Sequence, residues 1–447
     1  MIKVQNKTHA VQRLRSAGLA TLLVAATVQP YFASAAALHR VATTPQTYKE
    51  TKIRPVVIAV RVDPTADISI DEINATHSTI TLRKFQALPE TYLLRVRDDG
   101  DANKVLKALN GDKRLLYAEL EMLSTPPEAD PINIKAWGMD PTPYHSQDAL
   151  QRLNLERAHA LSQGKGMVVA VIDTGVQLNH PALSPFYVAG YDFVDGDAIA
   201  EDIGNTIDDD GDGSVDEATG HGTHIAGIVH LVAPEARIMP IRVLDADGVG
   251  SLFDVIDGIA FAVQNGARVI NLSLSVTDKS RLLSDTVRYA TERGVVVVAS
   301  AGNLNDNLMQ YPAADPCAIA VTSVNAMDIR SYFSSYGGWI DFAAPGEGIY
   351  STFVGGGYSW WSGTSMAAPF VAGQAAVLLA IDPGLNAREV AGVIEKSSHK
   401  IDQLKLNKDY HKSLGIGRID IGASTELLAS GTFKNSGPKT IKGGCVH

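Results

Sequence analysis

The sequence predicts an α/β fold, in which a mostly parallel sheet carries helices on both faces and follows a small α+β domain. From about residue 150 onward, apolar runs long enough to fill whole strands alternate with segments of helical character. Before residue 125 the strand-like runs are more mixed, and a Pro-rich stretch separates the two patterns. Strands that are apolar along their whole length, separated by helices, are typical of a parallel sheet covered on both faces.

Residues 1–35 are typical of a secretory signal. Four basic residues among the first 15 precede an Ala/Leu/Val-rich stretch at 17–28, and Ala33-Ser34-Ala35 offers small residues for cleavage. The apolar stretch is short for a membrane span. We therefore expect a secreted or periplasmic protein with no membrane contact after signal removal. The alternative is an uncleaved N-terminal anchor.

Residues 36–125 form the predicted α+β domain. A helix is expected at 101–109, with Asp101 as its cap and Gly111 at its end. The expected strands lie at 53–60, 79–83, 92–97 and 114–123. Residues 126–147 contain repeated prolines and are expected to be an exposed, extended linker that holds a processing site.

Residues 148–430 form the predicted α/β domain, and the polar tail 431–447 is expected to be loosely held. The buried strands are expected at 167–172, 237–243, 269–274, 295–299 and 318–324. The helices are expected at 221–232, 252–264, 280–293, 370–380 and 386–397.

Composition excludes some classes of function. The 447 residues are 45% hydrophobic and 20% charged, as in ordinary globular proteins, and the net charge of −10 argues against nucleic-acid binding. Two cysteines, Cys317 and Cys445, are too few for a disulfide framework. The sequence leaves open whether they pair or stay as separate thiols.

Ser365 lies where a Gly-rich loop becomes an apolar helix. The free N–H groups and the dipole of a helix N-terminus favour a developing negative charge there. A serine at this place is either a helix cap or a nucleophile, and the choice depends on whether the chain also supplies a base and an orienting acid.

Three further polar residues stand at similar places. Asp173 directly follows the strand 167–172, His221 opens a helix, and Asn303 follows the strand 295–299. Each alone is most simply a cap or turn residue. His221 and His224 are spaced like a metal pair, but no third ligand or general base stands at metalloprotease spacing, so one is better used as a base. Together, the order Asp, His, Ser is one of the known orders of the serine triad.

Three motifs resemble the signatures of the subtilisin-like serine proteases: 171–176 (VIDTGV), 220–227 (GHGTHIAG) and 363–369 (GTSMAAP). Residues 232–244 and 342–346 are also similar to this family. The resemblance extends from about residue 137 to residue 421.

The resemblance implies a secreted serine endopeptidase that acts on protein or peptide substrates. It implies that Ser365 is the nucleophile, His221 the general base and Asp173 the residue that orients the imidazole. The oxyanion would be held by the Asn303 side chain and the Ser365 backbone N–H. The rival class is a catalytically silent scaffold on the same fold, which the complete set of residues disfavours. A narrow processing protease is a further alternative, and His221 disfavours the acidic relatives that use Glu and Asp.

The same resemblance assigns Ser273, Leu274, Ser275 and Gly302 to substrate binding. Relatives usually carry Gly where this chain has Ser275, and the segment 304–311, which should line the opposite wall, looks short. We expect a restricted pocket of modest size. The physiological substrate is not predicted.

The stretch 208–217 is rich in Asp and Gly. Oxygen ligands at alternate positions suit Ca²⁺, and Asp208, Asp210, Asp212 and Asp216 fall in phase with an EF-hand loop, although Thr219 stands where its bidentate Glu belongs. We expect a structural Ca²⁺ site. The alternative is a solvated acidic loop.

Residues 36–125 resemble the inhibitory propeptides of this family, particularly at 115–119. The resemblance implies a zymogen whose own propeptide acts as a folding aid and temporary inhibitor, with the following linker lying through the cleft. A permanent accessory domain is the rival interpretation.

Overall fold

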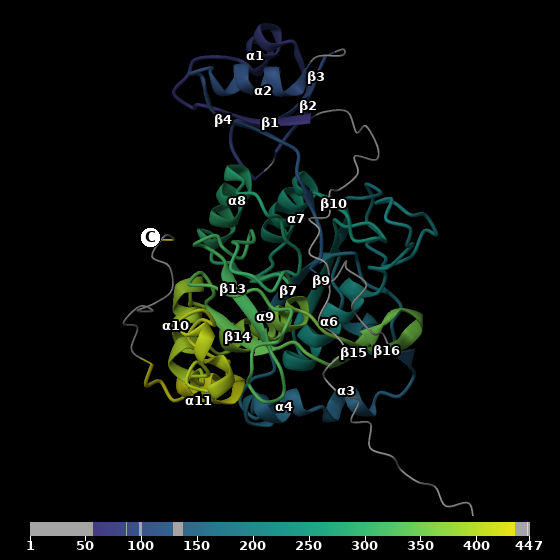
Figure 1. Ribbon diagram of the computed structural model, residues 1–447, viewed down its shortest axis with the longest axis vertical. Helices are drawn as coiled ribbons and strands as arrows, with labels where there is room; N and C mark the ends of the chain where they lie inside the picture. Colours follow the sequence, from purple (N-terminus) through teal and green to yellow (C-terminus); the bar gives the residue numbers. More distant parts are fainter. Residues whose placement is uncertain (1–56, 86, 98–100, 128–136, 434–444, 446–447) are drawn as a thin grey trace, which may run out of the picture. The chain divides into compact units, whose positions relative to one another are not determined.

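A computed structural model describes residues 57–85, 87–97, 101–127, 137–433 and 445 (Figure 1). The expected signal, most of the tail and part of the linker lie outside these residues. In the described part of the chain, the largest sheet has seven strands in the order β14-β13-β12-β11-β7-β9-β8, all paired in parallel. The α/β class and the parallel sheet are thus confirmed.

The strands of this sheet match the predicted apolar runs closely. From one edge to the other they are β14 (Phe342–Pro345), β13 (Ile319–Val324), β12 (Val296–Ser300), β11 (Val269–Leu272), β7 (Val168–Asp173), β9 (Arg237–Arg242) and β8 (Tyr191–Asp192). The two short edge strands, β8 and β14, have no counterpart in the prediction, because two to four residues are too few for a recognisable period.

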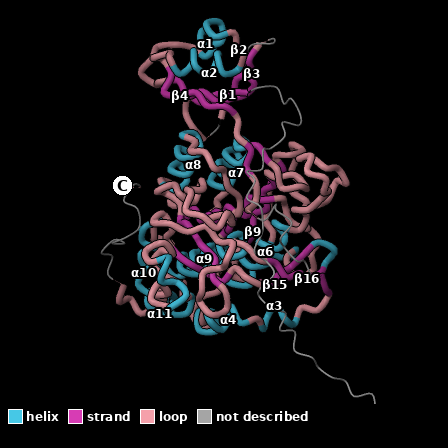
Figure 2. Tube along the Cα trace, in the orientation of Figure 1, coloured by secondary structure: helices cyan, strands magenta, loops and turns pink. Residues whose placement is uncertain are grey.

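Helices cover both faces of the sheet (Figure 2). Val169 and Val171 of β7 belong to one core with α6 (His221–Val232) and α9 (Thr364–Ile381), whereas Ala170 and Ile172 belong to the core with α7 (Leu252–Gln264) and α8 (Arg281–Thr291). Successive side chains of a strand point to opposite faces, so an unbroken apolar run fills both cores.

The helix α9 runs through the interior. It is long and apolar enough to cross a membrane, but 89% of it is buried inside the protein. Helices α10 (Ala387–Ser397) and α11 (Ile421–Ala429) contact it, and α5 (Leu155–His159) packs against α11 in the same core. It is therefore a core helix that carries its first turn to the carboxyl end of the sheet.

The N-terminal sheet has the order β2-β3-β1-β4 and is antiparallel where its pairing is described. Its strands are β1 (Val57–Val62), β2 (Thr79–Lys84), β3 (Thr91–Val96) and β4 (Leu115–Leu120). Helix α2 (Ala102–Asn110) begins at the predicted cap, where Asp101 accepts hydrogen bonds from the backbone N–H groups of Asn103 and Lys104. Helix α1 (Ile70–His77) was not predicted, although Ser69 and Glu72 form the capping box that marks its start.

The predicted exposed linker differs from the structure over residues 137–147. β6 (Trp137–Gly138) pairs with β16 (Gly357–Trp361), which also pairs with β15 (Ile349–Phe353). Helices α3 (Thr142–Ser146) and α4 (Asp148–Arg152) follow. Tyr144 is buried and donates a hydrogen bond to the Gly227 carbonyl at 2.6 Å. Proline is tolerated in the first turn of a helix, so Pro141 and Pro143 do not prevent α3.

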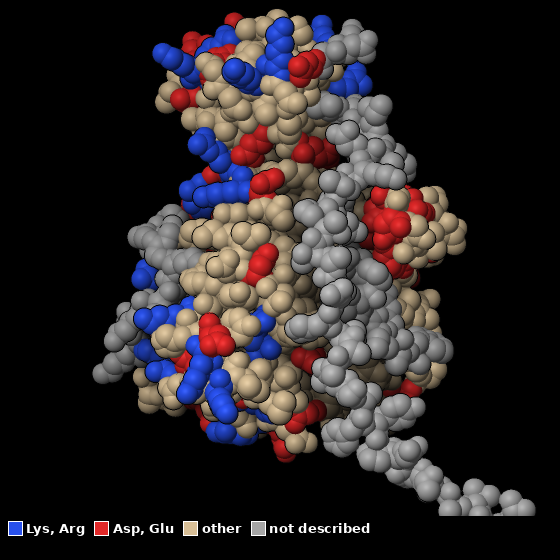
Figure 3. Space-filling model, viewed as in Figure 1, with Lys and Arg blue, Asp and Glu red and all other residues tan. Residues whose placement is uncertain are grey.

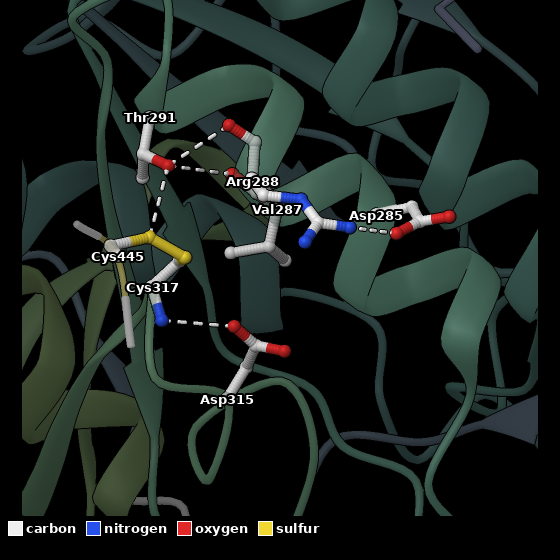
Figure 4. The surroundings of a disulfide bond; sticks show 7 residues. All are labelled: Asp285, Val287, Arg288, Thr291, Asp315, Cys317 and Cys445. Atoms are coloured by element: carbon white, nitrogen blue, oxygen red, sulfur yellow. Dashed lines mark hydrogen bonds and ion pairs between the residues drawn. A yellow bond between two sulfur atoms is a disulfide. The ribbon is translucent and has the colours of Figure 1, made fainter. Parts of the chain in front are cut away.

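A disulfide joins Cys317 to Cys445, which are 128 residues apart in sequence (Figure 4). The Cys445 sulfur lies 3.5 Å from the Thr291 hydroxyl at the end of α8. The bridge attaches the C-terminal region to the peptide that leads into β13. It resolves the choice that the sequence left open.

Candidate active site

Polar residues follow three neighbouring strands of the large sheet at their carboxyl ends. β7 ends with Asp173, Ser273 comes directly after β11, and Asn303 follows β12. Because Ile172 pairs with Leu272, Asp173 and Ser273 stand level on strands about 4.8 Å apart. The carboxyl ends of parallel strands are where open α/β sheets place their sites.

His221 is the first residue of α6, and its fully buried ring meets Asp173. The imidazole Nδ1 lies 2.7 Å from Asp173 Oδ1, which also accepts a 2.8 Å hydrogen bond from the Thr174 backbone N–H. A carboxylate at Nδ1 keeps the proton on that nitrogen. The imidazole can then act as a base through Nε2.

The glycines on either side of His221 let α6 begin so close to the end of β7. Gly220 has a φ of 92°, and a Cβ there would lie 2.3 Å from the Phe353 ring. A Cβ on Gly222 would lie 2.0 Å from the Gly175 carbonyl oxygen. Any larger residue at either place would push His221 away from Asp173.

Ser365 lies in the first turn of α9 and is fully buried. Two hydrogen bonds connect it to Ser273: the Ser273 hydroxyl donates to the Ser365 carbonyl at 3.0 Å, and the Ser365 hydroxyl donates to the Ser273 carbonyl at 3.3 Å. Since Ser273 stands level with Asp173 on the next strand, the structure brings Ser365 to the same edge of the sheet as Asp173 and His221.

Asn303 is tied to the same turn of α9. Its Oδ1 accepts hydrogen bonds from the Thr364 backbone N–H at 3.0 Å and from the Thr364 hydroxyl at 2.9 Å. The Thr364 hydroxyl oxygen in turn accepts from the Gly302 N–H at 3.0 Å. Two donors on one atom identify it as the carbonyl oxygen of the amide. The Nδ2 amino group of Asn303 therefore faces away from Thr364 as a donor.

His224, one turn further along α6, is held by a hydrogen bond and by packing. Its Nε2 lies 3.1 Å from the Ser359 carbonyl oxygen, and its ring packs edge-on against Trp361. His221 also packs edge-on against Trp361, with ring centroids 5.3 Å apart. The two imidazoles differ in their polar partners: His221 contacts the Asp173 carboxylate and His224 the Ser359 carbonyl.

The residues predicted to bind substrate lie beside the corner where the end of β7 meets the start of α6. Leu274 is buried, and Ser275 exchanges two backbone hydrogen bonds with Thr125, at 2.9 and 3.2 Å. Gln310 lies in the segment 304–311 that the resemblance assigns to the opposite wall, although the sequence did not single it out. Its side chain packs so closely on Gly302 that a Cβ there would lie 2.9 Å from its Cγ. Gln310 is 3% exposed, and within the described residues its Nε2 has no hydrogen-bond partner.

Residues 123–125, which follow the N-terminal sheet, run along the 273–275 segment. β5 (Leu123–Ser124) pairs antiparallel with β10 (Gly250–Ser251), and Thr125 continues the ladder on Ser275. The chain therefore lies between β10 and the 273–275 segment, in an extended form, and heads toward Ser273. Ser124 is fully buried in this arrangement.

Acidic side chains gather on the loop between β8 and α6 (Figure 3). Asp208, Asp210 and Asp212 each offer a carboxylate oxygen, and these oxygens all lie within 4.8 Å of one another. Ca²⁺ binds oxygen at about 2.3–2.6 Å, so ligands of one ion lie within roughly 5 Å of one another. Burial, together with the charges of Asp212, Asp247 and Asp208, raises the pKa of Asp210. The three carboxylates fit a divalent cation.

The structure does not bring Asp216 into this group. Its carboxylate accepts hydrogen bonds from the backbone N–H groups of Asn205 and Thr206, at 2.6 and 3.1 Å. Asp216 thus closes the base of the loop.

Sequence reasoning also missed Asp202, which lies beneath the first turn of α6. It is 4% exposed and accepts hydrogen bonds from Thr174, Gly220 and Thr223. In the sequence it is one acid among several, and nothing local separates it from its exposed neighbours.

Comparisons with known proteins agree with this geometry. A model described as "Subtilase family" matches residues 164–417. The chain is 38% identical over 314 residues to a "Thermophilic serine proteinase" of Bacillus sp. (strain AK1), covering 68% of this chain and 72% of that protein. It is 41% identical over 271 residues to "Thermitase" of Thermoactinomyces vulgaris, covering 58% and 91%. The structure of fervidolysin from Fervidobacterium pennivorans, whose title calls it a keratinolytic enzyme related to subtilisin, superposes with a TM-score of 0.65 at 26% identity, covering 83% of this chain and 60% of that one.

Proposed function

The chain belongs to the subtilase family and is a subtilisin-like serine endopeptidase, and from this premise we propose that Asp173, His221 and Ser365 are its catalytic triad. The observation that carries the proposal is the buried 2.7 Å contact between His221 and Asp173, beside a serine held at the same sheet edge by Ser273.

The chemistry follows from these positions. Ser365 Oγ attacks the carbonyl carbon of the substrate peptide bond while His221 Nε2 takes its proton. The C–N bond then breaks as the imidazolium gives that proton to the leaving amine, which produces an acyl-enzyme. Water, activated by the same imidazole, releases the acid product. Asp173 holds the imidazole and stabilises its charged form.

Asn303 and the Ser365 backbone N–H are the proposed oxyanion hole. Thr364 occupies the Asn303 carbonyl oxygen, so the amide is oriented before substrate arrives and needs no reorganisation. The positive end of the α9 helix dipole adds positive potential where negative charge develops.

We place the substrate along the 273–275 strand, with Ser273, Leu274, Ser275 and Gly302 lining the pocket for the residue before the cut bond. The packing of Gln310 against Gly302 supports a restricted pocket. A neutral amide, rather than a charged group, favours uncharged side chains of small or medium size.

The enzyme is proposed to be made as a zymogen, with its own propeptide as a temporary inhibitor. The pairing of residues 123–125 with β10 and Ser275 supports this, since that segment lies where a substrate would lie. Glu119 supports it as well: its carboxylate accepts hydrogen bonds from Ser280 Oγ and the Arg281 N–H, both at 2.7 Å, at the start of α8.

We further propose that Asp208, Asp210 and Asp212 hold a structural Ca²⁺, which would neutralise three closely spaced charges beside the loop that leads to His221. Export is proposed from the signal-like residues 1–35. The Cys317–Cys445 disulfide supports it, because disulfides persist in oxidising compartments.

The experiment is a comparison of the purified wild-type protein with Ser365→Ala. We expect the wild type to hydrolyse casein, to mature at a site after residue 120 and to react with a serine-directed fluorophosphonate. Ser365→Ala should do none of these, with hydrolysis reduced on the order of 10⁶-fold, as for the corresponding replacement in subtilisin. Correctly matured wild type that is inert toward casein and probe would contradict the proposal.

A further inference from the structure

One buried carboxylate near the site has no role in the chemistry above. Asp202 is 4% exposed and each of its oxygens accepts two hydrogen bonds. Oδ1 accepts from the Gly220 N–H at 2.9 Å and the Thr174 hydroxyl at 3.2 Å. Oδ2 accepts from the Thr223 N–H at 3.0 Å and the Thr223 hydroxyl at 2.6 Å. Asp202 thus caps the N-terminus of α6 from a separate segment, a place that Gly220 cannot cap with a side chain of its own.

Two of the three partners of Asp202 are direct neighbours of the proposed triad residues. Thr174 follows Asp173 and Gly220 precedes His221, while the third partner, Thr223, lies two residues beyond His221. The Thr174 hydroxyl, which donates to Asp202, also accepts the Gly222 N–H at 3.0 Å. Asp202 is thus bonded to Gly220, which precedes His221, and Thr174 to Gly222, which follows it. Together they connect the end of β7 to both sides of His221, around the Asp173–His221 contact.

We propose that Asp202 is a positioning residue: through Thr174 and the first turn of α6 it sets the orientation of the His221 ring against Asp173. This inference rests on the proposed function. It goes beyond it by assigning a part in catalysis to a residue that does not touch substrate.

The charge state of Asp202 makes the inference testable by pH. The titratable groups that interact with it are Asp173 and Tyr187, and Glu201 is its neighbour in the chain. Burial, offset by the hydrogen bonds from Thr223 and Gly220 and reinforced by the charge of Asp173, raises the pKa of Asp202 to about 6.

The raised pKa of Asp202 in the folded protein determines how its contribution to stability changes with pH. Protonated Asp202 favours the folded state, so its contribution to stability is full below its ordinary pKa of 3.8 and is lost as the pH rises through about 6. The positioning of His221 by Asp202 depends on pH in the opposite direction. A proton on either oxygen displaces one of the two donors there, so the connection loosens below pH 6 while the fold does not weaken. The kcat of the wild type should therefore fall through two ionisations on the acid side, those of His221 and Asp202.

The test is Asp202→Asn in the full chain, assayed after maturation with a peptide substrate. An asparagine of the same size puts an NH₂ group against two donors in either orientation. We expect kcat to fall roughly 10- to 100-fold, the size of effect produced by a misplacement of about 1 Å, with KM changed less than about twofold. The acid limb of kcat should simplify to a single ionisation.

Asp420→Asn is the matched control. Asp420 is also a buried aspartate that caps a helix, accepting the Ala423 N–H at 2.8 Å at the start of α11. It should lower the melting temperature and leave kcat and the pH profile unchanged. In proton NMR, the downfield signal of the His221 Nδ1–H should shift or broaden in Asp202→Asn and stay in place in Asp420→Asn.

The outcomes separate the inference from general destabilisation. A folded Asp202→Asn enzyme with wild-type kcat and an unchanged acid limb would overturn the inference, and so would equal losses in Asp420→Asn. If Asp202→Asn does not accumulate, Thr174→Val decides: a similar fall in kcat at constant KM supports the inference, and unchanged kcat overturns it. A wild type without activity would instead contradict the proposed function.

Discussion

Two acidic regions lie close together in sequence but differ in how their carboxylates are hydrogen-bonded. In the corner formed by β7 and α6, Asp173 and Asp202 are buried. Asp173 contacts the His221 ring, and Asp202 accepts hydrogen bonds from backbone N–H groups and hydroxyls of distant segments. In the loop that starts a few residues later, Asp208, Asp210 and Asp212 bond mainly to the backbone of their own loop and face one another.

The difference shows what each region needs in order to function. The corner obtains its partners from the fold, so its geometry is complete once the chain has folded. The loop holds three carboxylates whose oxygens lie within 4.8 Å of one another, and a cation would neutralise their charges. Changes in the corner should therefore alter turnover, whereas changes in the loop should alter stability and its dependence on Ca²⁺.

The largest effect is expected from Asn303→Leu, which keeps the side-chain size and removes the donor. Loss of one oxyanion donor lowers kcat by about 10²–10³-fold, with KM nearly unchanged, because the interaction strengthens only as charge develops. Steady-state kinetics with a peptide substrate measure it. Asn265→Leu, at an exposed helix end, should leave kcat unchanged. A fall in KM that accompanies the fall in kcat would argue against an oxyanion role.

This corner was largely predictable from the sequence, for a physical reason. The strand β7 reads as a continuous apolar run, and Asp173, His221, Asn303 and Ser365 each stand at the end of a strand or the start of a helix. Parallel topology brings such places to one edge. The sequence also shows glycines on either side of His221. They are required there because only glycine allows α6 to approach the end of β7 so closely.

Other features depend on contacts that no local pattern records. Asp202 and Gln310 look like ordinary loop residues in the sequence. Asp202 bonds to segments 18 or more residues away in the chain, and Gln310 packs on Gly302, across a turn of the loop. The linker was expected to be exposed because of its prolines, but the packing of Tyr144 under α6 overrides that tendency. The sequence indicated the acidic loop, yet it could not show that Asp216 bonds to Asn205 and Thr206 rather than joining the other acids.

Removal of Ca²⁺ should destabilise the acidic loop. Because the ion binds only the folded loop, at 100 times its dissociation constant it would stabilise the protein by about 2.7 kcal/mol. EDTA should then lower the apparent melting temperature by roughly 5 °C at a fixed scan rate and speed autolysis. Asp210→Asn should abolish the response to EDTA, while Asp409→Asn, an exposed acid elsewhere, should keep it. A melting curve unaffected by EDTA would show that the loop holds no stabilising Ca²⁺.

A buried amide side chain also lies next to Gly302, just after β12. Gln310 is buried there with an amide nitrogen that the described residues do not satisfy. Gln310→Gly should open the pocket and raise kcat/KM for a Phe before the cut bond, relative to Ala, by about 10- to 100-fold, since each extra apolar group accommodated contributes about 1–3 kcal/mol. A peptide series varied at that position measures it. Gln403→Gly, on the surface, should leave the ratio as it is. An unchanged ratio in Gln310→Gly would place that side chain outside the pocket.

Glu119 represents a third way to satisfy charge, in which a carboxylate from the N-terminal sheet caps α8 and so holds two parts of the chain together. Glu119→Ala removes acceptors for Ser280 Oγ, the Arg281 N–H and the Leu282 N–H. Loss of a cap costs about 0.5–2 kcal/mol, so inhibition by the cleaved propeptide should weaken roughly 2- to 30-fold and the lag before full casein activity should shorten accordingly. Asp67→Ala, an exposed acid of the same domain, should leave the lag unchanged. A lag that is equal in both variants would mean that this contact forms only after the two parts are already held by the 123–125 ladder, and inhibition would then depend on the segment in the cleft alone.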